Sequence, residues 1–233
     1  MSRLVIQLTI TLNTALSIGA GGSAGTQADK SIVRDGWGRP LIPGSQVKGK
    51  VRWAVEQLLR GTGTTVPAPF DHEIEQSIDQ KIENPTLVRS LFGSPNHRSP
   101  LRFADLPTTI VPAQQAITMQ QNLSQIRPSV SINRQCGVAD DQRLLFQEAA
   151  HEGMVFRAEN AISGTLPDDL NAQQAAALLW AALKLTDRWG GAKSRGLGWA
   201  TISTTVAIDN TVLDEPGLAN ALRSVLTARG GTL

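Results

Sequence analysis

The first twelve residues carry the pattern that most limits how this chain can fold. Between Arg3 and Leu12, apolar side chains alternate with polar ones, so that one side of an extended chain carries Leu4, Ile6, Leu8, Ile10 and Leu12. An alternation of period two is typical of a β-strand that has one face on a hydrophobic core. The segment therefore predicts a strand that is half buried in a sheet.

Two helices are predicted further along the chain. The first begins near Ser45, an N-cap candidate, and ends at about Arg60, where Gly61 can stop it. Its apolar stripe consists of Val47, Val51, Ala54, Val55, Leu58 and Leu59. The second begins at Asn171, which forms a capping-box-like pair with Gln174, and runs to about Trp189.

Strands are predicted from Met154 to Ile162, ending at Gly164, and from Trp199 to Val206, with a short edge strand at Ile32 and Val33. The region from about Thr62 to Gln147 is rich in proline and polar residues, and we expect insertions and loops there. The order strand, helix, strands, helix, strand is that of an α+β fold with a ferredoxin-like βαββαβ core.

Composition excludes several classes of protein. The single cysteine, Cys136, allows no intramolecular disulfide, and three histidines without clustering give no zinc motif. No stretch approaches the roughly 18 apolar residues of a membrane span, so we expect a soluble, unprocessed, cytoplasmic protein. The net charge is only +2, so any nucleic-acid site must come from local clustering of basic residues.

A glycine-rich basic segment between the second helix and the last strand is the most distinctive local pattern. From Gly190 to Gly198 it holds four glycines together with Lys193, Ser194 and Arg195. Glycines permit close backbone approach, so successive N–H groups can point at one anion while the two cations neutralise it. We interpret the segment as a phosphate-binding loop formed by Gly190, Gly191, Lys193, Ser194, Arg195, Gly196 and Gly198. A plain helix C-cap and turn is the alternative, especially for Gly190.

The first helix gives a second, independent indication. Lys48 and Arg52 lie four residues apart on one face, which costs about 0.2–0.5 kcal/mol, and the interior Gly49 costs about 1 kcal/mol relative to alanine. A phosphate near Ser45, contacted by Lys48, Lys50 and Arg52, would offset these costs, although a solvated basic face is an equal alternative for this helix alone. Together with the loop, it favours binding of RNA or another polyphosphate.

In order and spacing, a series of motifs over nearly the whole chain resembles the RAMP superfamily of CRISPR proteins, and most closely the repeated backbone subunit of type III effector complexes. These motifs are Ile18-Gly-Ala-Gly, Ala28-Asp-Lys-Ser-Ile-Val-Arg-Asp35, Ile42-Pro-Gly-Ser-Gln-Val-Lys-Gly-Lys-Val-Arg52, Leu91-Phe-Gly-Ser94, Arg102-Phe-Ala-Asp105, Arg127-Pro-Ser-Val-Ser-Ile-Asn-Arg134, Gly137-Val-Ala139, Leu145-Phe146, Glu148, Gly153-Met-Val-Phe156 and the glycine loop.

The resemblance implies one RAMP or RRM-like domain over residues 1–233, with a lid-like insertion at about 62–105 and a β-hairpin thumb at about 106–147. It implies a subunit that polymerises along guide CRISPR RNA, kinks its duplex with target RNA, and contacts a large polymerase-like subunit, a small subunit and a subunit that caps the guide 5′ end. No membrane partner is expected. Arg127 and Arg134 fall in the thumb, where they either contact guide phosphates or only solvate the hairpin.

The resemblance also implies catalysis by Asp29, which from its sequence alone is a turn former or solvated charge. Its carboxylate would hold Mg²⁺ or Mn²⁺ for cleavage of the target RNA, whereas Asp35 is expected to be structural in its Asp-Gly turn. Two alternatives stay open: a backbone paralogue that only binds guide RNA, and the guide-maturation endonuclease of the same superfamily. The latter is disfavoured because the N-terminal loop has no histidine.

Four tryptophans flank the basic segments, and aromatic faces can stack on bases. Trp37, in the turn, is expected to be open to solvent, whereas core packing is expected for Trp53 and Trp199. Trp189 is predicted at the end of the second helix.

Overall fold

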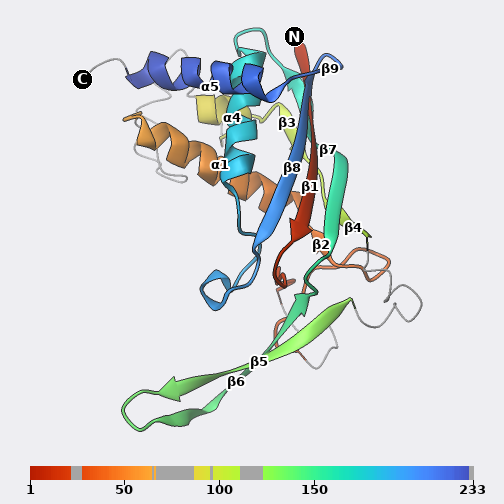
Figure 1. The fold of residues 1–233 in the computed structure, drawn as a ribbon, viewed down its shortest axis with the longest axis vertical. Coiled ribbons are helices and arrows are strands. Elements are labelled where there is room, and N and C mark those ends of the chain that lie inside the picture. Colours follow the sequence, from red (N-terminus) through yellow and green to blue (C-terminus); the bar gives the residue numbers. More distant parts are fainter. Residues whose placement is uncertain (22–27, 65, 67–86, 95–96, 111–122, 231–233) are drawn as a thin grey trace.

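The computed structural model describes the chain except residues 22–27, 65, 67–86, 95–96, 111–122 and 231–233. Figure 1 shows a main sheet with the helices gathered on one side of it and a long hairpin that projects from one end of the sheet. Helices and an antiparallel sheet in one unit confirm the predicted α+β class. Within the described residues no helix has the length and apolar character needed to cross a bilayer.

The main sheet is centred on β1 (Ser2–Leu12), which pairs antiparallel with β7 (Val155–Leu166) and with β8 (Ala200–Ile208). The full order is β2-β4-β7-β1-β8-β9, and β3 also pairs with β7. The outer strands are β2 (Leu41–Ile42), β3 (Leu101–Phe103), β4 (Leu106–Ile110) and β9 (Thr211–Val212). Ile32 and Val33 lie in no strand; Ile32 makes one isolated bridge with Gly19.

The alternation in β1 is confirmed, because its five leucines and isoleucines from Leu4 to Leu12 are all buried. Burial of each such side chain stabilises the fold by about 1.5–3 kcal/mol. The helices α1 (Gly44–Gly61), α3 (Leu87–Phe92), α4 (Ala172–Leu185) and α5 (Glu215–Gly230) complete the fold. Five of the six predicted stripe residues of α1 are buried, and Leu58 packs against the same core.

The start of α1 differs from the prediction. Its N-cap is Pro43, whose side chain accepts no hydrogen bond, and Ser45 lies exposed in the first turn. The first helical N–H, that of Gly44, instead donates to the Asp105 carboxylate at 2.7 Å. A carboxylate distant in sequence thus replaces the expected local cap.

The start of α4 is as predicted and its end is not. The Asn171 side chain accepts hydrogen bonds from the N–H groups of Gln173 and Gln174. The helix ends at Leu185 rather than near Trp189, because the Trp189 N–H donates to the carbonyl of Gly198 at 2.8 Å and its fully buried indole belongs to the core.

Strand β7 continues through Gly164, where the sequence pattern predicted its end. The carbonyl of Pro100 lies so close to Gly164 that a Cβ atom there would overlap it. This glycine therefore permits the pairing of β3 with β7 and does not terminate the strand.

The hairpin consists of β5 (Ser124–Asn133) and β6 (Val138–Ala150), which form a separate two-stranded sheet. Leu106–Ile110, at the start of the expected hairpin insertion, pairs with β2 and β7 in the main sheet instead. Within the expected lid-like insertion, the described residues include α3 and β3. The part of that insertion from 67 to 86 lies outside the described residues.

Candidate functional site

The two basic segments singled out in the sequence meet in space. Gln46, Gly49, Lys50 and Trp53 from α1 and Lys193 from the glycine loop line a pocket of about 360 Å³, here called the α1–loop pocket. Partial burial and the neighbouring ammonium of Lys193 lower the pKa of Lys50 to about 8, against an opposing effect of Asp187. The fold therefore holds two cations together at one exposed pocket.

The other cations of α1 have contacts inside the protein. The Lys48 ammonium lies 6.0 Å from the centre of the Phe103 ring, and the Arg52 guanidinium donates to Glu56 at 2.9 Å. Glu56, which is buried, also pairs with Arg60. The charge of Arg52 is thus paired without a phosphate, and neither Lys48 nor Arg52 lines the α1–loop pocket.

The glycine loop is held in shape by its own backbone. The N–H groups of Gly191 and Gly198 donate to the carbonyls of Ser17 and Ala15, and those of Arg195, Gly196 and Leu197 donate within the loop. The predicted cradle of successive free N–H groups is wrong for these five positions, because the loop uses them to close its turn. The anion-binding groups that it exposes are the side chains of Lys193, Ser194 and Arg195.

Close packing requires two of the four glycines in the loop. Gly190 and Gly198 have positive φ angles of 69° and 83°, and a Cβ atom at either would overlap the carbonyl of Ser17 or of Trp189. Gly198 is buried, so it lies away from the exposed surface. Gly196, also with positive φ, is exposed with open space around it.

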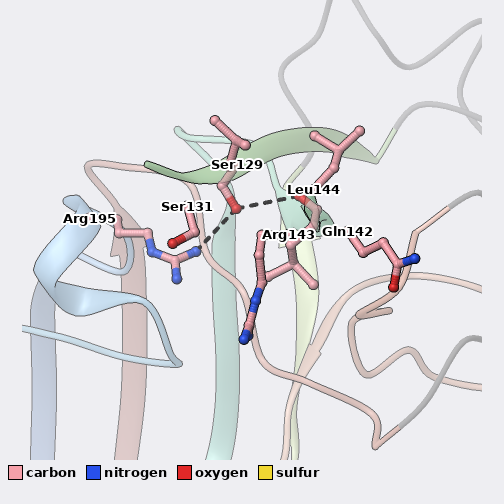
Figure 2. A pocket seen from close by; sticks show the side chains of 8 residues that line it. Ser129, Ser131, Gln142, Arg143, Leu144 and Arg195 are labelled. Atoms are coloured by element: carbon pink, nitrogen blue, oxygen red, sulfur yellow. Dashed lines mark hydrogen bonds between the residues drawn. The ribbon is translucent and has the colours of Figure 1, made fainter. Parts of the chain in front are cut away.

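Arg195 connects the loop to the hairpin (Figure 2). Its Nη1 donates to Ser129 Oγ on β5 at 3.4 Å. Around this contact lies a second pocket, of about 640 Å³, here called the loop–hairpin pocket, which is lined by Ser129, Val130, Ser131, Gln142, Arg143, Leu144, Leu145 and Arg195. Figure 2 shows Arg143 and Arg195 both beside Ser129, so this pocket carries two cations and two hydroxyl groups.

Arg143 was missed in the sequence because no local pattern marks it. It stands in the run Asp140-Asp-Gln-Arg, which is neutral or acidic on balance. The pairing of β5 with β6 shifts register between Val130 and Ile132, and Gln142 adopts a positive φ of 58°. This irregularity lies where Arg143 lines the pocket, and such strand irregularities commonly redirect side chains.

The two predicted hairpin arginines lie elsewhere on the hairpin. Arg127 is exposed on β5 and Arg134 is exposed in the turn between β5 and β6. Neither side chain forms an ion pair or hydrogen bond with the described residues, and neither lines the loop–hairpin pocket. Both are thus available to an external anion.

Asp29 lies at the root of the hairpin, bound to β6. Its N–H donates to the carbonyl of Phe146 at 2.9 Å, and its carboxylate Oδ2 accepts from the Phe146 N–H at 2.8 Å. Asp29 is exposed, and its Oδ1 has no hydrogen-bond partner among the residues that the structure describes. The loop continues along β6, because the Glu148 N–H donates to the carbonyl of Lys30 at 3.0 Å.

A buried charge cluster fixes this loop. Glu148 is 3% exposed and accepts hydrogen bonds from Arg34, from Ser124 Oγ and from the Ile32 N–H. Burial acts to raise the pKa of Glu148, but these hydrogen bonds and the Arg34 charge outweigh it and lower the pKa below its usual value. Glu148 therefore joins the Asp29 loop to both hairpin strands.

A resident metal centre made only of protein groups is not found in the described part of the chain, where no three His, Cys, Asp or Glu residues cluster. Asp29 offers one carboxylate oxygen, Oδ1, that has no hydrogen-bond partner among the described residues. Mg²⁺ commonly binds through one or two carboxylates, with water and substrate phosphates as its other ligands. The donor at Asp29 fits a divalent ion shared with a bound polyphosphate.

Asp35 has the structural role that was expected. Its Oδ1 accepts from the N–H groups of Trp37 and Arg39, and the Arg39 guanidinium pairs with Oδ2. Desolvation acts to raise the pKa of Asp35, but the hydrogen bonds and the Arg39 charge bring it below its usual value. The carboxylate is used to close the turn.

The tryptophan predictions are partly wrong. Trp37 is 84% exposed, as expected, but Trp53 is 62% exposed and Trp199 is 37% exposed, not packed in the core. Trp53 lies on the face of α1 opposite to the buried stripe, and Trp199 stacks against the Arg188 guanidinium, 3.9 Å from its ring centre. An exposed aromatic ring therefore stands at the α1–loop pocket, where the sequence analysis placed none.

Comparisons with known proteins identify the family of the chain. The family model described as "RAMP superfamily" matches residues 9–201. The protein named "CRISPR system Cms endoribonuclease Csm3" from Mycobacterium tuberculosis is 35% identical over 95 residues, which are 40% of this chain and 36% of the relative. The matched region thus spans little more than a third of that relative's length.

Proposed function

Because the chain belongs to the RAMP superfamily, we propose that it is a guide-RNA-binding backbone subunit of a type III CRISPR complex that cleaves complementary target RNA. The observation that carries the proposal is the meeting of Lys50 and Lys193 at one pocket whose described lining includes no carboxylate. Two apposed cations of this kind are suited to a phosphate, which neutralises both. The relative whose name includes the word endoribonuclease supports the cleavage part of the proposal.

The RNA backbone follows the basic side chains from the α1–loop pocket to the hairpin. Lys193 and Arg195 are two residues apart on the loop, and each lines a different pocket. A phosphate chain that binds Lys50 and Lys193 therefore reaches Arg195 and Arg143 next. Ser194, between the two loop cations, and Arg127 and Arg134 on the hairpin lie exposed for further phosphate contacts.

In this proposal the main sheet with α1 and α4 is the ferredoxin-like core, and the β5–β6 hairpin is the thumb. The hairpin projects away from the sheet (Figure 1). It carries exposed apolar side chains on both of its strands, which are Ile126, Val130, Ile132, Val138 and Leu144. Apolar side chains on a projecting element can wedge between stacked bases. The thumb would thereby unstack the target nucleotide beside Asp29.

Cleavage in this proposal depends on Asp29. The adjacent 2′-hydroxyl loses its proton to solvent and attacks the target phosphate in line, and the unstacked nucleotide supplies the required alignment. The bond from phosphorus to the 5′-oxygen breaks, so the products are a 2′,3′-cyclic phosphate end and a 5′-hydroxyl end. Asp29 offers its free Oδ1 toward that phosphate, while Phe146 and Glu148 hold the loop in place. Bound Mg²⁺ or Mn²⁺, held by Asp29 and phosphate oxygens, would supply stabilisation of the developing negative charge.

We propose that further copies of this chain, the large polymerase-like subunit, the small subunit and the guide 5′-end capping subunit are its partners in the cytoplasm. Guide RNA reads the target by base pairing, so the subunit itself needs no sequence preference.

A second candidate function is a backbone subunit that binds guide RNA without cleaving. It is favoured by one observation, because Asp29 Oδ2 accepts a hydrogen bond from Phe146 and so has a structural use. The two candidates differ only in what the free Oδ1 does.

The experiment compares wild type, Asp29→Asn and Asp29→Ala in complexes assembled on guide RNA with a labelled complementary target, in Mg²⁺ and in EDTA. Asparagine retains an oxygen that can accept from Phe146 but loses the charge. We expect both variants to bind target RNA and both to lose cleavage by a factor of at least about 10². Cleavage by Asp29→Asn at the wild-type rate would assign Asp29 to structure alone.

Asp169→Asn is the matched control. Asp169 is an exposed carboxylate that follows β7 at Leu166 and lines neither of the two pockets, whereas Asp29 is bound to β6. We expect it to cleave as wild type does. Equal loss in Asp169→Asn and Asp29→Asn would show that the effect is a general one of charge.

A further inference from the structure

One face of α1 is not packed on the core of the described residues. Gln46, Gly49, Lys50 and Trp53 follow the spacing i, i+3, i+4, i+7, so they form one stripe along the helix. Lys193 faces this stripe from the glycine loop. The buried stripe from Val47 to Leu59 lies on the other side of the helix and packs on the core.

Trp53 is the unusual member of the stripe. Trp53 is 62% exposed, and within the described residues its ring makes no aromatic or cation contact. A side chain of this size contributes most when buried, and an exposed one in a pocket is common where a flat ligand stacks. The exposed indole thus adds little to the stability of the described fold and is available to a ligand.

Gly49 is a second indication that this face of α1 is kept open for a ligand. A Cβ atom at this exposed position would meet nothing within 4 Å, so internal packing does not require the glycine. An interior helical glycine is unfavourable relative to alanine. The missing side chain instead leaves room in the pocket that Gly49 lines together with Lys50 and Trp53.

The dimensions and the chemistry of the pocket suit a single nucleotide. Its volume of about 360 Å³ is near the lower end of the range of roughly 300–1,000 Å³ seen for small-molecule sites. It presents one aromatic face and two ammonium groups, which are the groups that bind a base and a phosphate in single-stranded nucleic acid.

We propose that Trp53 is a stacking platform for one base of the guide RNA, and that Lys50 and Lys193 bind the phosphate next to that base. The inference rests on the proposed function and deepens it, because it assigns a base contact to a site otherwise used only for phosphates. Every base has an aromatic face, so the contact is tolerant of sequence. It fixes the position of one nucleotide per subunit without reading its identity.

The experiment removes the Trp53 side chain and the RNA bases, separately and together, and compares the four affinities. The intact chain, as wild type and as Trp53→Ala, is titrated with a short single-stranded RNA and with an abasic oligomer of the same ribose-phosphate length. We expect Trp53→Ala to weaken RNA binding at least fivefold and to leave binding of the abasic oligomer unchanged. Equal weakening for both oligomers would overturn the stacking role.

The salt dependence separates this inference from the proposed function. Trp53→Ala should leave the slope of log affinity against log salt unchanged, whereas Lys50→Ala with Lys193→Ala should reduce it by about 0.7, the value for the one phosphate that the two lysines share. Absence of RNA binding by wild type would refute the proposed function itself. Normal binding with a lysine-dependent slope but no effect of Trp53→Ala would refute the stacking platform alone.

Two controls test whether the effect of Trp53→Ala belongs to stacking in this pocket. Trp37→Ala removes an indole that is more exposed, at 84%, but does not line the pocket, and it should bind RNA as wild type does. Sedimentation of Trp53→Ala without RNA tests whether the ring is a contact between protein copies. Weaker self-association with unchanged RNA affinity would overturn the proposal and assign the face to a protein partner.

Discussion

At the root of the hairpin Arg34 lies against Glu148, whereas at the α1–loop pocket Lys50 lies beside Lys193. Both regions bring charges together from distant parts of the sequence. At the hairpin root the charges are opposite, and hydrogen bonds from Ser124 and Ile32 satisfy the buried carboxylate. At the pocket the charges are alike and partly exposed, so each ammonium group raises the electrostatic energy of the other, against an opposing effect of Asp187 on Lys50.

The difference separates charges that maintain the fold from charges that are available for binding. The same contrast divides α1 itself, because Lys48 and Arg52 have internal partners, whereas no described carboxylate lies at hydrogen-bond distance from Lys50. Counting basic residues along a helix therefore overstates the binding surface. What identifies a binding cation is the absence of internal compensation.

The largest effect is expected at the hairpin root. Glu148→Ala removes the acceptor of three hydrogen bonds and leaves Arg34 and the Ile32 N–H without it. Because Glu148 is buried and Arg34 is about a third exposed, we expect a loss of about 2–4 kcal/mol in the free energy of unfolding. Urea denaturation measures this change, and a loss below about 0.5 kcal/mol would contradict the structural role of the cluster.

An exposed glutamate near the same end of the hairpin is the control for Glu148→Ala. Glu152→Ala removes a glutamate that is exposed in the turn between β6 and β7. It should change the unfolding free energy by no more than about 0.5 kcal/mol. A comparable loss in both variants would mean that this end of the hairpin is sensitive to any change.

An intermediate effect is expected from pH at the α1–loop pocket. The folded pKa of Lys50 is about 8, below its ordinary value of 10.5, so Lys50 loses its proton as pH rises through about 8. RNA affinity should then fall by a few-fold between about pH 7 and pH 9, because one phosphate contact loses its charge. Fluorescence anisotropy at fixed salt measures this change, and Lys50→Arg should remove the dependence, since arginine stays charged.

The stability of the free protein should change in the opposite direction. Between the folded pKa and the unfolded value, the unfolded chain holds a proton at Lys50 that the folded chain has lost, so stability rises with pH in this window. Lys50→Met should abolish this contribution.

A wild-type RNA affinity that is constant from pH 7 to pH 9 would show that Lys50 does not contact the bound phosphate.

Local sequence patterns predicted much of the fold because their causes are local. The alternation of β1, the stripe of α1 and the cap at Asn171 depend on neighbours within a few residues. The cap of α1 did not follow such a rule. Asp105 reaches the Gly44 N–H from 61 positions away, and no nearby residue indicates that contact.

The sequence predicted which segments form the candidate site, but not which of their side chains line it. The sequence identified α1, the glycine loop and the Asp29 loop, but not that Lys50 rather than Lys48 faces Lys193. It also placed Trp53 in the core, because large aromatic side chains are usually buried. In the structure Trp53 is exposed, because it lies on the face of α1 opposite to the buried stripe.

The smallest effect is expected at Gly49, where fold and binding should respond in opposite directions. Gly49→Ala adds a methyl group to an exposed helical position with open space around it, so the free energy of unfolding should increase by about 0.5–1 kcal/mol. The same methyl group occupies room in the pocket that Lys50 and Trp53 line, so RNA affinity should fall about two- to threefold. Gly61→Ala, at the exposed end of α1 and outside the pocket, is the control and should leave RNA affinity unchanged. A more stable Gly49→Ala protein that binds RNA as tightly as wild type would mean that the glycine is not kept for a ligand. The contrast between the α1 cations that have internal partners and those that do not would then depend on Lys50 alone.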